Sequence, residues 1–426
     1  MRICLLSYRS YRYSGGQGVY LRYLSRSLRD LGHSVDVVSG PPYPELDDGI
    51  RLIKVPSLDL YSMSSLRRLF IDPRKLDSAA SLVEWLGTIS GYFSEPIAFG
   101  MRAYNLLHNS GRNARYDIIH DNQTLAYGIL KIQELGFPVV ETIHHPMTVD
   151  RELAIKAATS LKNKLGVRRW YSFINMQVKV ARRISHIIAV SHTARQHIAT
   201  TFGIPPHRLR VIYNGIDTEI FSPSPTLNRL DNRLLVITSG NTAVKGLAYL
   251  LEALAQLRQE HNLELVVVGK GADNDMIRKL IGRLHISNYV KFIGEIDTTE
   301  LVNQYRLASI AVVPSTYEGF GLPAAEAMAC GAPIVATTAG ALPEVVGNAG
   351  ILVPPANVRA LTEAISALIN SPDKRKHLAE LGPKRVRQMF NWQNTAKDTV
   401  DVYHETIEYR KHLHSHCTSS LSSVLS

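Results

Sequence analysis

The residues best able to do chemistry lie in the sequence STYEGFGLPAAEAMACGAPIVAT, where Glu318 and Glu326 stand on either side of a glycine-rich turn. Gly319 and Gly321 have no side chains, so a ligand can approach the backbone amides of the turn. Pro323 suits the first position of a helix, and free N–H groups at a helix start attract phosphate. Carboxylates beside such amides can accept hydrogen bonds from sugar hydroxyls. This pattern predicts a phosphorylated ligand rich in hydroxyl groups.

The two glutamates also have a simpler interpretation, because acidic residues near a helix start stabilise the helix dipole. The complete string resembles the Glu-x7-Glu signature of glycosyltransferase family 4, a family of retaining sugar transferases with the GT-B fold. The resemblance implies that Glu318 contacts the hydroxyls of the donor sugar and that Glu326 contacts the ribose of the nucleotide. It also implies that the amides around Phe320 to Leu322 face the sugar and the diphosphate.

A second glycine-rich loop, SGGQG, contains Gly16 and lies between the predicted strand Arg2–Ser7 and the predicted helix Val19–Leu31. It does not match the dinucleotide pattern G-x-G-x-x-G, which disfavours an NAD-dependent oxidoreductase. A tight turn into a helix is one explanation of the loop. The stretch GGQGVYLRYLSRSLRDLGHSVDVV resembles the family 4 segment that lies across the cleft from the donor phosphates. The resemblance therefore assigns Gly16 to donor binding.

Two further predicted strands end in polar residues. The strand over 116–121 ends at Asp121, and the strand over 138–143 is followed by His144 and His145. Ligands of a doubly wound sheet meet the carboxyl ends of its strands. A hydrogen-bonded structural histidine is the alternative. The family has a T-[VI]-H pattern here, so the resemblance implies a catalytic His144 that contacts the sugar, with His145 and Asp121 as secondary candidates.

The second half of the chain supplies a basic residue for the same ligand. The predicted strand Leu234–Thr238 leads into SGNTAVKG, which resembles the family pattern G-R-x(4)-K-G at Lys245. The family arginine is missing, and Asn241 stands near its place. Lys245 would then neutralise the donor diphosphate as a point charge, aided by backbone amides. Arg195 follows the predicted strand His186–Val190, where the family often has a basic residue near the cleft, so the resemblance makes it a further candidate.

An Asp-x-Asp pair, Asp273 and Asp275, could suggest a metal site. It lies between a glycine turn and the predicted helix Met276–Leu284, so helix capping explains it more simply. Two carboxylates without further ligands make a poor magnesium site. We therefore expect no metal and no cofactor, since the nucleotide-sugar donor is a substrate.

The order of predicted elements is α/β. Together with the resemblance it implies the GT-B fold, with two Rossmann-like, doubly wound parallel-sheet domains that face a cleft. We expect residues 1–219 to form the first domain, on the acceptor side, and residues 220–392 to form the donor domain. The closing helix, 393–412, should pack back on the first domain, and 413–426 should be disordered. Residues 56–115 receive no chemical role.

Composition narrows the class of protein. The chain has 426 residues, of which 45% are hydrophobic, a formal net charge of +11, and three scattered cysteines. No apolar run could span a bilayer, and the odd cysteines favour a reducing cytosol over a disulfide framework. The basic, aromatic helices predicted over 151–183 could lie on an anionic membrane, although a solvated helical face is the simpler explanation. Nucleic acid is disfavoured because no binding motif accompanies the charge.

The expected function is transfer of a hexose, with retention and without metal, from a UDP-, GDP- or ADP-sugar to an acceptor hydroxyl. The acceptor could be a glycolipid, a saccharide or a small metabolite, which places the protein in carbohydrate or glycolipid biosynthesis. We expect a cytoplasmic location, with peripheral contact to the inner face of the membrane. Two alternatives stay open: a non-catalytic nucleotide-sugar-binding protein, and a nucleotide-sugar epimerase or hydrolase on the same fold.

Overall fold

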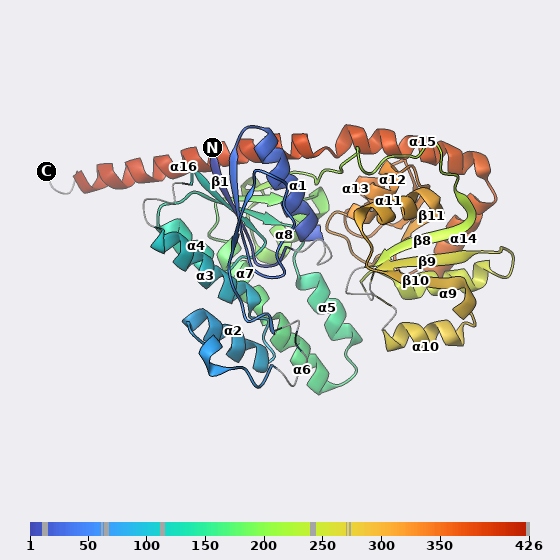
Figure 1. The fold of residues 1–426 in the computed structure, drawn as a ribbon, viewed down its shortest axis with the longest axis horizontal. Helices are drawn as coiled ribbons and strands as arrows, with labels where there is room; N and C mark the ends of the chain where they lie inside the picture. Colours follow the sequence, from blue (N-terminus) through green and yellow to red (C-terminus); the bar gives the residue numbers. More distant parts are fainter. Residues whose placement is uncertain are drawn as a thin grey trace.

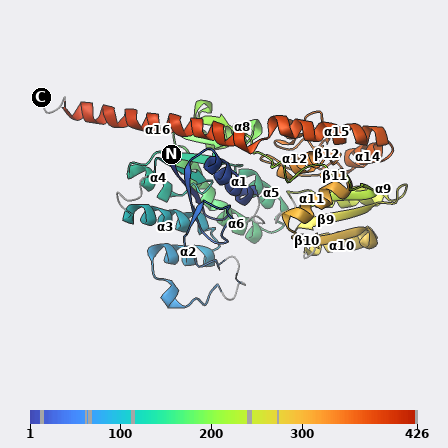
Figure 2. The ribbon, with the colours of Figure 1, turned by 45° about the horizontal axis from the view of Figure 1, so that its top comes forward.

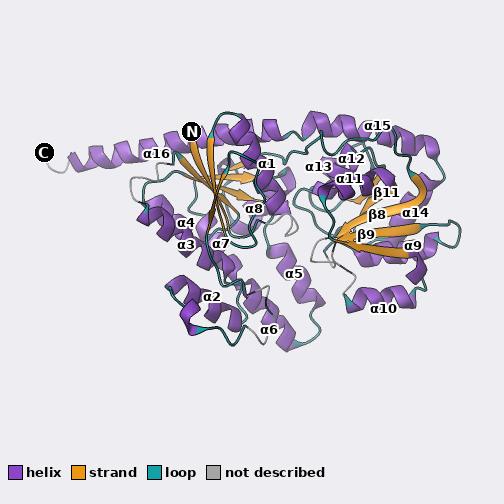
Figure 3. Ribbon diagram, in the orientation of Figure 1, coloured by secondary structure: helices purple, strands orange, loops and turns teal. Residues whose placement is uncertain are grey.

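The protein is seen here in a computed structural model, which describes residues 1–10, 16–60, 63, 68–110, 116–238, 244–269, 271 and 274–422. Two parallel sheets, each covered by helices, form two domains side by side (Figure 1, Figure 3). Among the described residues, no helix is both long enough and apolar enough to cross a membrane.

The first sheet has the strand order β3-β2-β1-β4-β5-β6-β7, and every neighbouring pair is parallel. Chain order reverses between β1 and β4, which creates the switch point where Rossmann-like domains bind ligands. The strands are β1 (Arg2–Ser7), β2 (Ser34–Ser39), β3 (Arg51–Lys54), β4 (Ile118–Asn122), β5 (Val139–Ile143), β6 (His186–Ala189) and β7 (Leu209–Val211).

The helices of the first domain connect these parallel strands. They are α1 (Gly16–Asp30), α2 (Ala79–Ile89), α3 (Glu95–Asn109), α4 (Tyr127–Glu134), α5 (Thr148–Ala157), α6 (Leu161–Trp170), α7 (Ile174–Ala181) and α8 (His192–Phe202). Helix α1 begins at Gly16, earlier than the predicted start at Val19. The basic stretch 151–183 is helical as predicted, but it divides into separate helices.

The second sheet has the order β10-β9-β8-β11-β12-β13 and is also parallel. Its strands are β8 (Leu230–Thr238), β9 (Glu264–Gly269), β10 (Val290–Gly294), β11 (Ala308–Val313), β12 (Ile334–Thr337) and β13 (Ile351–Val353). Its helices are α9 (Leu247–Leu257), α10 (Asp275–Arg283), α11 (Thr298–Leu307), α12 (Leu322–Ala329), α13 (Leu342–Val346), α14 (Val358–Ile369) and α15 (Pro372–Met389).

The last helix, α16 (Trp392–Ser422), leaves the second domain and runs along the first (Figure 1, Figure 2). Trp392 stacks on Tyr23 of α1 with ring centroids 5.5 Å apart, and the Tyr403 hydroxyl lies 2.6 Å from Nδ1 of His120. The helix continues to Ser422, where we expected disorder from residue 413. Extending a helix that already exists costs far less than nucleating one, which accounts for the extra turns.

Candidate active site

Lys245 and Glu318 form an ion pair at the carboxyl ends of the second sheet. The Lys245 Nζ atom lies 2.6 Å from Glu318 Oε1, and Ser315 Oγ donates to the same oxygen at 2.8 Å. The side chain of Glu318 is 9% exposed and that of Lys245 is 20% exposed. The structure thus brings together the cation predicted for the diphosphate and the carboxylate predicted for the sugar.

The glycine-rich turn before α12 contacts the first domain directly. A Cβ atom added to Gly319 would lie 2.3 Å from the carbonyl oxygen of His144, so only glycine fits. The Ser191 hydroxyl, at the start of α8, donates to the Gly319 carbonyl at 2.7 Å. A Cβ on Gly16 would lie 3.3 Å from Cδ1 of Leu322. Gly16 and Gly319, one from each predicted glycine segment, therefore lie at the junction of the two domains.

Helix α12 begins after Gly321, whose φ of 99° is in the left-handed region. Glu326 lies on this helix and its side chain is buried. The Tyr305 hydroxyl donates a hydrogen bond to Glu326 Oε2 at 2.9 Å. Burial raises the pKa of Glu326 to about 7. Burial, then the charge of Asp217 and, to a smaller extent, that of Glu326 raise the pKa of Tyr23 on α1 to about 12. Glu326 therefore lies close enough to the first domain to affect a group across the junction.

His144 is held at the carboxyl end of β5 by the residues that follow β4. Its Nε2 lies 2.7 Å from Asn122 Oδ1, and its backbone N–H donates to Gln123 Oε1 at 2.6 Å. The Tyr20 ring packs edge-on at 4.8 Å between centroids. Burial, and then the nearby His145, lower the pKa of His144 to about 3. A neutral imidazole can exchange hydrogen bonds with a sugar hydroxyl, and it cannot act as a cationic acid here.

His145 follows at the same strand end but has a different partner. Its Nε2 lies 2.9 Å from Asp150 Oδ2 on α5. Its ring lies 5.9 Å from that of Tyr317, which directly precedes the glycine-rich turn Glu318–Gly321, called the donor turn below after the role predicted for it. His145 therefore also sits at the junction, fixed to its own domain by Asp150.

Asp121 does not reach the cleft, contrary to our expectation. Its side chain is fully buried beneath the β4–α4 loop and accepts the backbone N–H of Leu125 at 2.9 Å. It pairs with Glu141 on β5, whose Oε1 accepts the N–H of Gln123 at 3.0 Å. Burial raises the pKa of both carboxyl groups. The pair fixes the loop that holds His144, so its role is positioning.

The chain was compared with known proteins. A glycosyltransferase family 4 model matches residues 14–220, and a model named glycosyl transferases group 1 matches residues 221–385. An MMP alpha-(1->4)-mannosyltransferase of Mycolicibacterium hassiacum is 46% identical over 96% of this chain and 98% of the relative. The chain belongs to the group 1 glycosyltransferases of family 4. It is accordingly a hexosyltransferase.

Other relatives of this transferase are more distant. A glycogen synthase of Mycobacterium tuberculosis is 26% identical, with 91% of each chain covered. Among solved structures, a sucrose-phosphate synthase from Thermosynechococcus elongatus superimposes with a TM-score of 0.73 at 23% identity, covering 96% of this chain and all of the other. HepE of Anabaena, in complex with UDP and glucose, gives 0.68 at 21% identity over 94% and 98% of the two chains. These structures confirm the predicted GT-B fold.

Two of the secondary site candidates, Arg195 and Asn241, are not placed at the donor turn by the structure. Arg195 donates to the carbonyl of Pro206 at 3.0 Å, within its own domain, so the structure does not direct it at the donor turn. Asn241 lies outside the described residues, as does Asp273 of the Asp-x-Asp pair. Asn274 caps α10 by accepting the N–H groups of Met276 and Ile277. Among the described residues, no three His, Cys, Asp or Glu side chains cluster in a way that could hold a metal ion.

Residue Gln123 of the transferase was given no role by the sequence. Its side-chain amide accepts from the N–H of His144 and donates to the carbonyl of His145 at 2.9 Å, so it clamps both histidines by their backbones. Its own φ of 57° is unusual for a residue other than glycine. Glu141 and Gln177 hold it in that conformation. The sequence feature that could have indicated this role is the position of Gln123, a polar residue close behind a buried strand.

A second missed group joins the two domains of the transferase. The Glu344 carboxylate, on α13, accepts the backbone N–H groups of His192 and Thr193, each at 2.9 Å, at the N-terminus of α8. The Tyr213 hydroxyl also donates to it at 3.0 Å. Tyr213 belongs to the first domain and Glu344 to the second, so this hydrogen bond also joins the two domains.

Proposed function

We propose that the protein transfers a mannosyl group, with retention and without metal, from a nucleoside-diphosphate mannose to a sugar hydroxyl. The single observation that carries the proposal is the Lys245–Glu318 pair beside the glycine turn and the buried Glu326. The mannosyl group is suggested by the relative at 46% identity, an alpha-(1->4)-mannosyltransferase. GDP-mannose is the donor to test first, ahead of UDP- and ADP-sugars.

In the proposed complex the donor lies against the second domain. Glu326 accepts hydrogen bonds from the ribose, and the amides of Phe320 to Leu322 with Lys245 hold the diphosphate. An arriving diphosphate would compete with Glu318 for the Lys245 ammonium. Glu318 would then be released to accept hydroxyl protons from the sugar. Breaking the sugar–phosphate bond places charge on the leaving diphosphate, which Lys245 and the amides stabilise.

The first domain completes the reacting geometry. His144, neutral and fixed by Asn122 and Gln123, contacts the donor sugar or the attacking hydroxyl. Gly16 leaves space for the diphosphate across the junction. We propose that the acceptor attacks from the face that the leaving group vacates, with a phosphate oxygen taking the hydroxyl proton. This route retains the anomeric configuration without a carboxylate nucleophile.

A two-step experiment tests this function. Thermal unfolding is first measured with GDP, UDP and ADP, because a ligand at about 100 times its Kd stabilises a fold by about 2.7 kcal/mol. The matching nucleotide mannose is then incubated with mannosides in EDTA, and NMR reads the anomeric configuration of the product. We expect an α-linked product. An inverted product would refute the mechanism. Binding without turnover would favour a non-catalytic protein, and free sugar or an epimer would favour the other enzymes.

We also propose that α6 contacts an anionic membrane. Leu161 is 72% exposed and Leu165 is 54% exposed, and the same helix carries Lys162, Arg168 and Arg169. An apolar face beside basic residues suits the boundary of an anionic bilayer. The double change Leu161→Ser and Leu165→Ser should reduce flotation with phosphatidylglycerol vesicles. Met276→Ser, at a comparably exposed apolar residue of the second domain, is the control. Equal flotation of all three proteins would refute the contact.

A further inference from the structure

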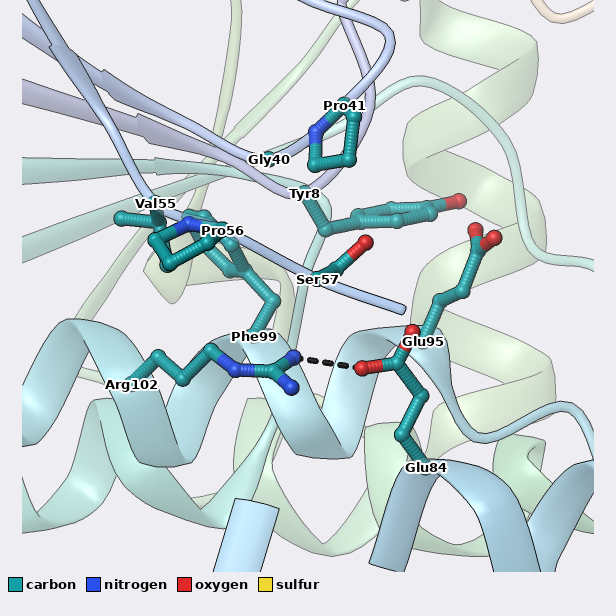
Figure 4. A pocket seen from close by; sticks show the side chains of 10 residues that line it. All are labelled: Tyr8, Gly40, Pro41, Val55, Pro56, Ser57, Glu84, Glu95, Phe99 and Arg102. Atoms are coloured by element: carbon teal, nitrogen blue, oxygen red, sulfur yellow. Dashed lines mark hydrogen bonds and ion pairs between the residues drawn. The ribbon is translucent and has the colours of Figure 1, made fainter. Parts of the chain in front are cut away.

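Most of the carboxylates that are buried in the first domain have an arginine partner. Arg102 Nη1 lies 2.6 Å from Glu84 Oε2, beside a cavity of about 10 Å³ that has room for about one water molecule (Figure 4). Arginines likewise pair with Asp36, Glu95 and Asp217. A buried carboxylate needs such compensation, because losing its hydration is costly. Asp121 and Glu141 are the exceptions, since neither has an ion-pair partner among the described residues.

Asp121 and Glu141 lie directly opposite each other on the neighbouring strands β4 and β5. Both side chains are fully buried, and they share a hydrogen bond. Asp121 Oδ1 and Glu141 Oε2 have no other partner among the described residues. A hydrogen bond between two carboxyl groups needs a proton, and two buried carboxyl groups this close cannot both ionise. One proton must therefore lie between these two oxygens.

Of the two carboxyl groups, Glu141 is the better holder of that proton. Leu125 donates its backbone N–H to Asp121 Oδ2 at 2.9 Å, and the backbone N–H of Thr124 also favours the ionised form of Asp121. Among the described residues, Glu141 accepts one N–H, that of Gln123, at Oε1 and 3.0 Å. Burial, and then the charge of Asp121, raise the pKa of Glu141 well above its usual range. The arrangement is thus a neutral acid, Glu141, that donates to an ionised Asp121.

The two carboxyl groups also hold the loop that positions the histidines. The N–H groups that they accept belong to Gln123 and Leu125, which have φ of 57° and 51°. Such conformations are costly for residues other than glycine, and they persist only where neighbouring groups impose them. The side chain of Gln123 in turn accepts from the N–H of His144 and donates to the carbonyl of His145. Glu141 therefore acts on both histidines through one residue.

We propose that Glu141 keeps its carboxyl proton in the folded chain, donates it in a hydrogen bond to Asp121 Oδ1, and thereby positions His144 for the reaction. This role rests on the proposed function, in which neutral His144 contacts the donor sugar or the attacking hydroxyl. Glu141 is then a positioning residue that touches no substrate itself. A purely structural explanation is that the pair only joins β4 to β5. That explanation predicts that changes at Glu141 alter stability and leave kcat unchanged.

Variants of Glu141 separate the two explanations. Glu141→Gln replaces the O–H donor by an N–H donor and keeps the acceptor for Gln123, so kcat should stay within about twofold of wild type. Glu141→Leu removes both hydrogen bonds, so kcat should fall about tenfold, while the KM for GDP-mannose stays unchanged because the second domain holds the donor. Adding Asp121→Asn to Glu141→Gln sets one N–H donor against another in every orientation of the two amides, so kcat should fall as in Glu141→Leu. The control is Glu134→Gln, an exposed change on α4.

Two spectroscopic measurements at pH 7 test the pair without turnover. The infrared difference spectrum of wild type minus Glu141→Gln should contain the C=O band of a protonated carboxylic acid. Glu95 and Glu326 titrate alike in both proteins and cancel from this difference. In NMR with 15N-labelled histidine, Glu141→Leu should shift the His144 signal and Glu141→Gln should leave it unchanged. His144→Ala assigns that signal.

The absence of the acid band would overturn the proposal, because Glu141 would then carry no proton. So would a Glu141→Gln variant with the low kcat of Glu141→Leu, because the carboxylate itself would then be needed. A folded Glu141→Leu variant with wild-type kcat and an unchanged His144 signal would leave only the structural explanation. Thermal unfolding checks folding, and the double variant decides if Glu141→Leu does not fold. A wild type that turns over no nucleotide sugar refutes the proposed function, and the infrared band and the His144 signal then decide the role of the pair separately.

Discussion

Replacing Glu326 by glutamine should make the free energy of unfolding less dependent on pH. Glu326 is buried on α12, accepts the Tyr305 hydroxyl and has a pKa raised to about 7 from the ordinary 4.5. The folded chain therefore binds a proton at this residue over a pH range in which the unfolded chain has lost it. Stability falls as the pH rises through this range, because ionisation is disfavoured in the folded state. Glutamine keeps the shape and removes the titration.

The size of the effect follows from the two pKa values. Each unit of difference is worth about 1.4 kcal/mol, so wild-type Glu326 costs about 3 kcal/mol of stability once the pH is well above 7. Near pH 5 the cost is below about 1 kcal/mol, since the folded form is still protonated. Between pH 5 and pH 8, Glu326→Gln should therefore gain about 2.5 kcal/mol relative to wild type. Changed hydrogen bonds add a constant offset and cancel from this difference.

The measurement is urea-induced unfolding at pH 5, 6, 7 and 8, followed by circular dichroism. Glu260→Gln is the matched control, because it makes the same chemical change at an exposed residue of the same domain. Glu95 also has a pKa of about 7, but it titrates equally in all three proteins. A stability difference between Glu326→Gln and wild type that stays constant with pH would refute the reasoning. It would mean that water or a counter-charge solvates Glu326 in the folded chain.

Three further predictions concern the junction of the domains. His144 has a pKa near 3 and stays neutral from pH 5 to 9, so His144→Ala should lower kcat about tenfold without changing the shape of the pH–rate profile; a lost inflection would contradict this. Gln123→Glu sets an oxygen against the His145 carbonyl, so kcat and Tm should both fall, while a wild-type kcat would exclude the clamp. Glu344→Ala should lower the free energy of unfolding by about 1–3 kcal/mol, because it removes the acceptor of three hydrogen bonds between the domains, and it should increase the radius of gyration in X-ray scattering. Tyr213→Phe removes only one of these bonds, so both changes should be smaller. An unchanged radius of gyration in Glu344→Ala would argue against a link between the domains.

The strands were predictable because buried parallel strands are nearly continuous apolar runs. Arg2–Ser7 was predicted with its observed bounds, and the predicted strand Leu234–Thr238 lies inside β8. Helix α15 carried no such signal, since it is polar and has Pro383 in its interior. The edge strands β7 and β13 were missed because runs of three residues carry too little pattern.

The site was predictable as far as strand ends and glycine turns determine it. Sequence placed His144 and Asp121 at neighbouring strand ends, but it could not tell that Asp121 turns inward to Leu125 and Glu141. The direction of the Asp121 side chain depends on a loop in which Gln123 and Leu125 have positive φ, and neither residue type predicts that conformation. Contacts between side chains distant in sequence, such as Lys245 with Glu318, likewise require the fold.

The contacts of the donor turn explain why catalysis in this transferase should be coupled to closure of the two domains. The same short turn carries Glu318, which Lys245 holds within the second domain, and Gly319, which touches His144 and Ser191 of the first. A ligand that displaces Glu318 from Lys245 would act on a backbone segment that also forms the interdomain contact. Gly319 cannot become alanine without pushing His144 away, because the added Cβ would lie 2.3 Å from its carbonyl oxygen. In the proposed complex, donor binding and the placement of His144 are therefore linked by backbone contact.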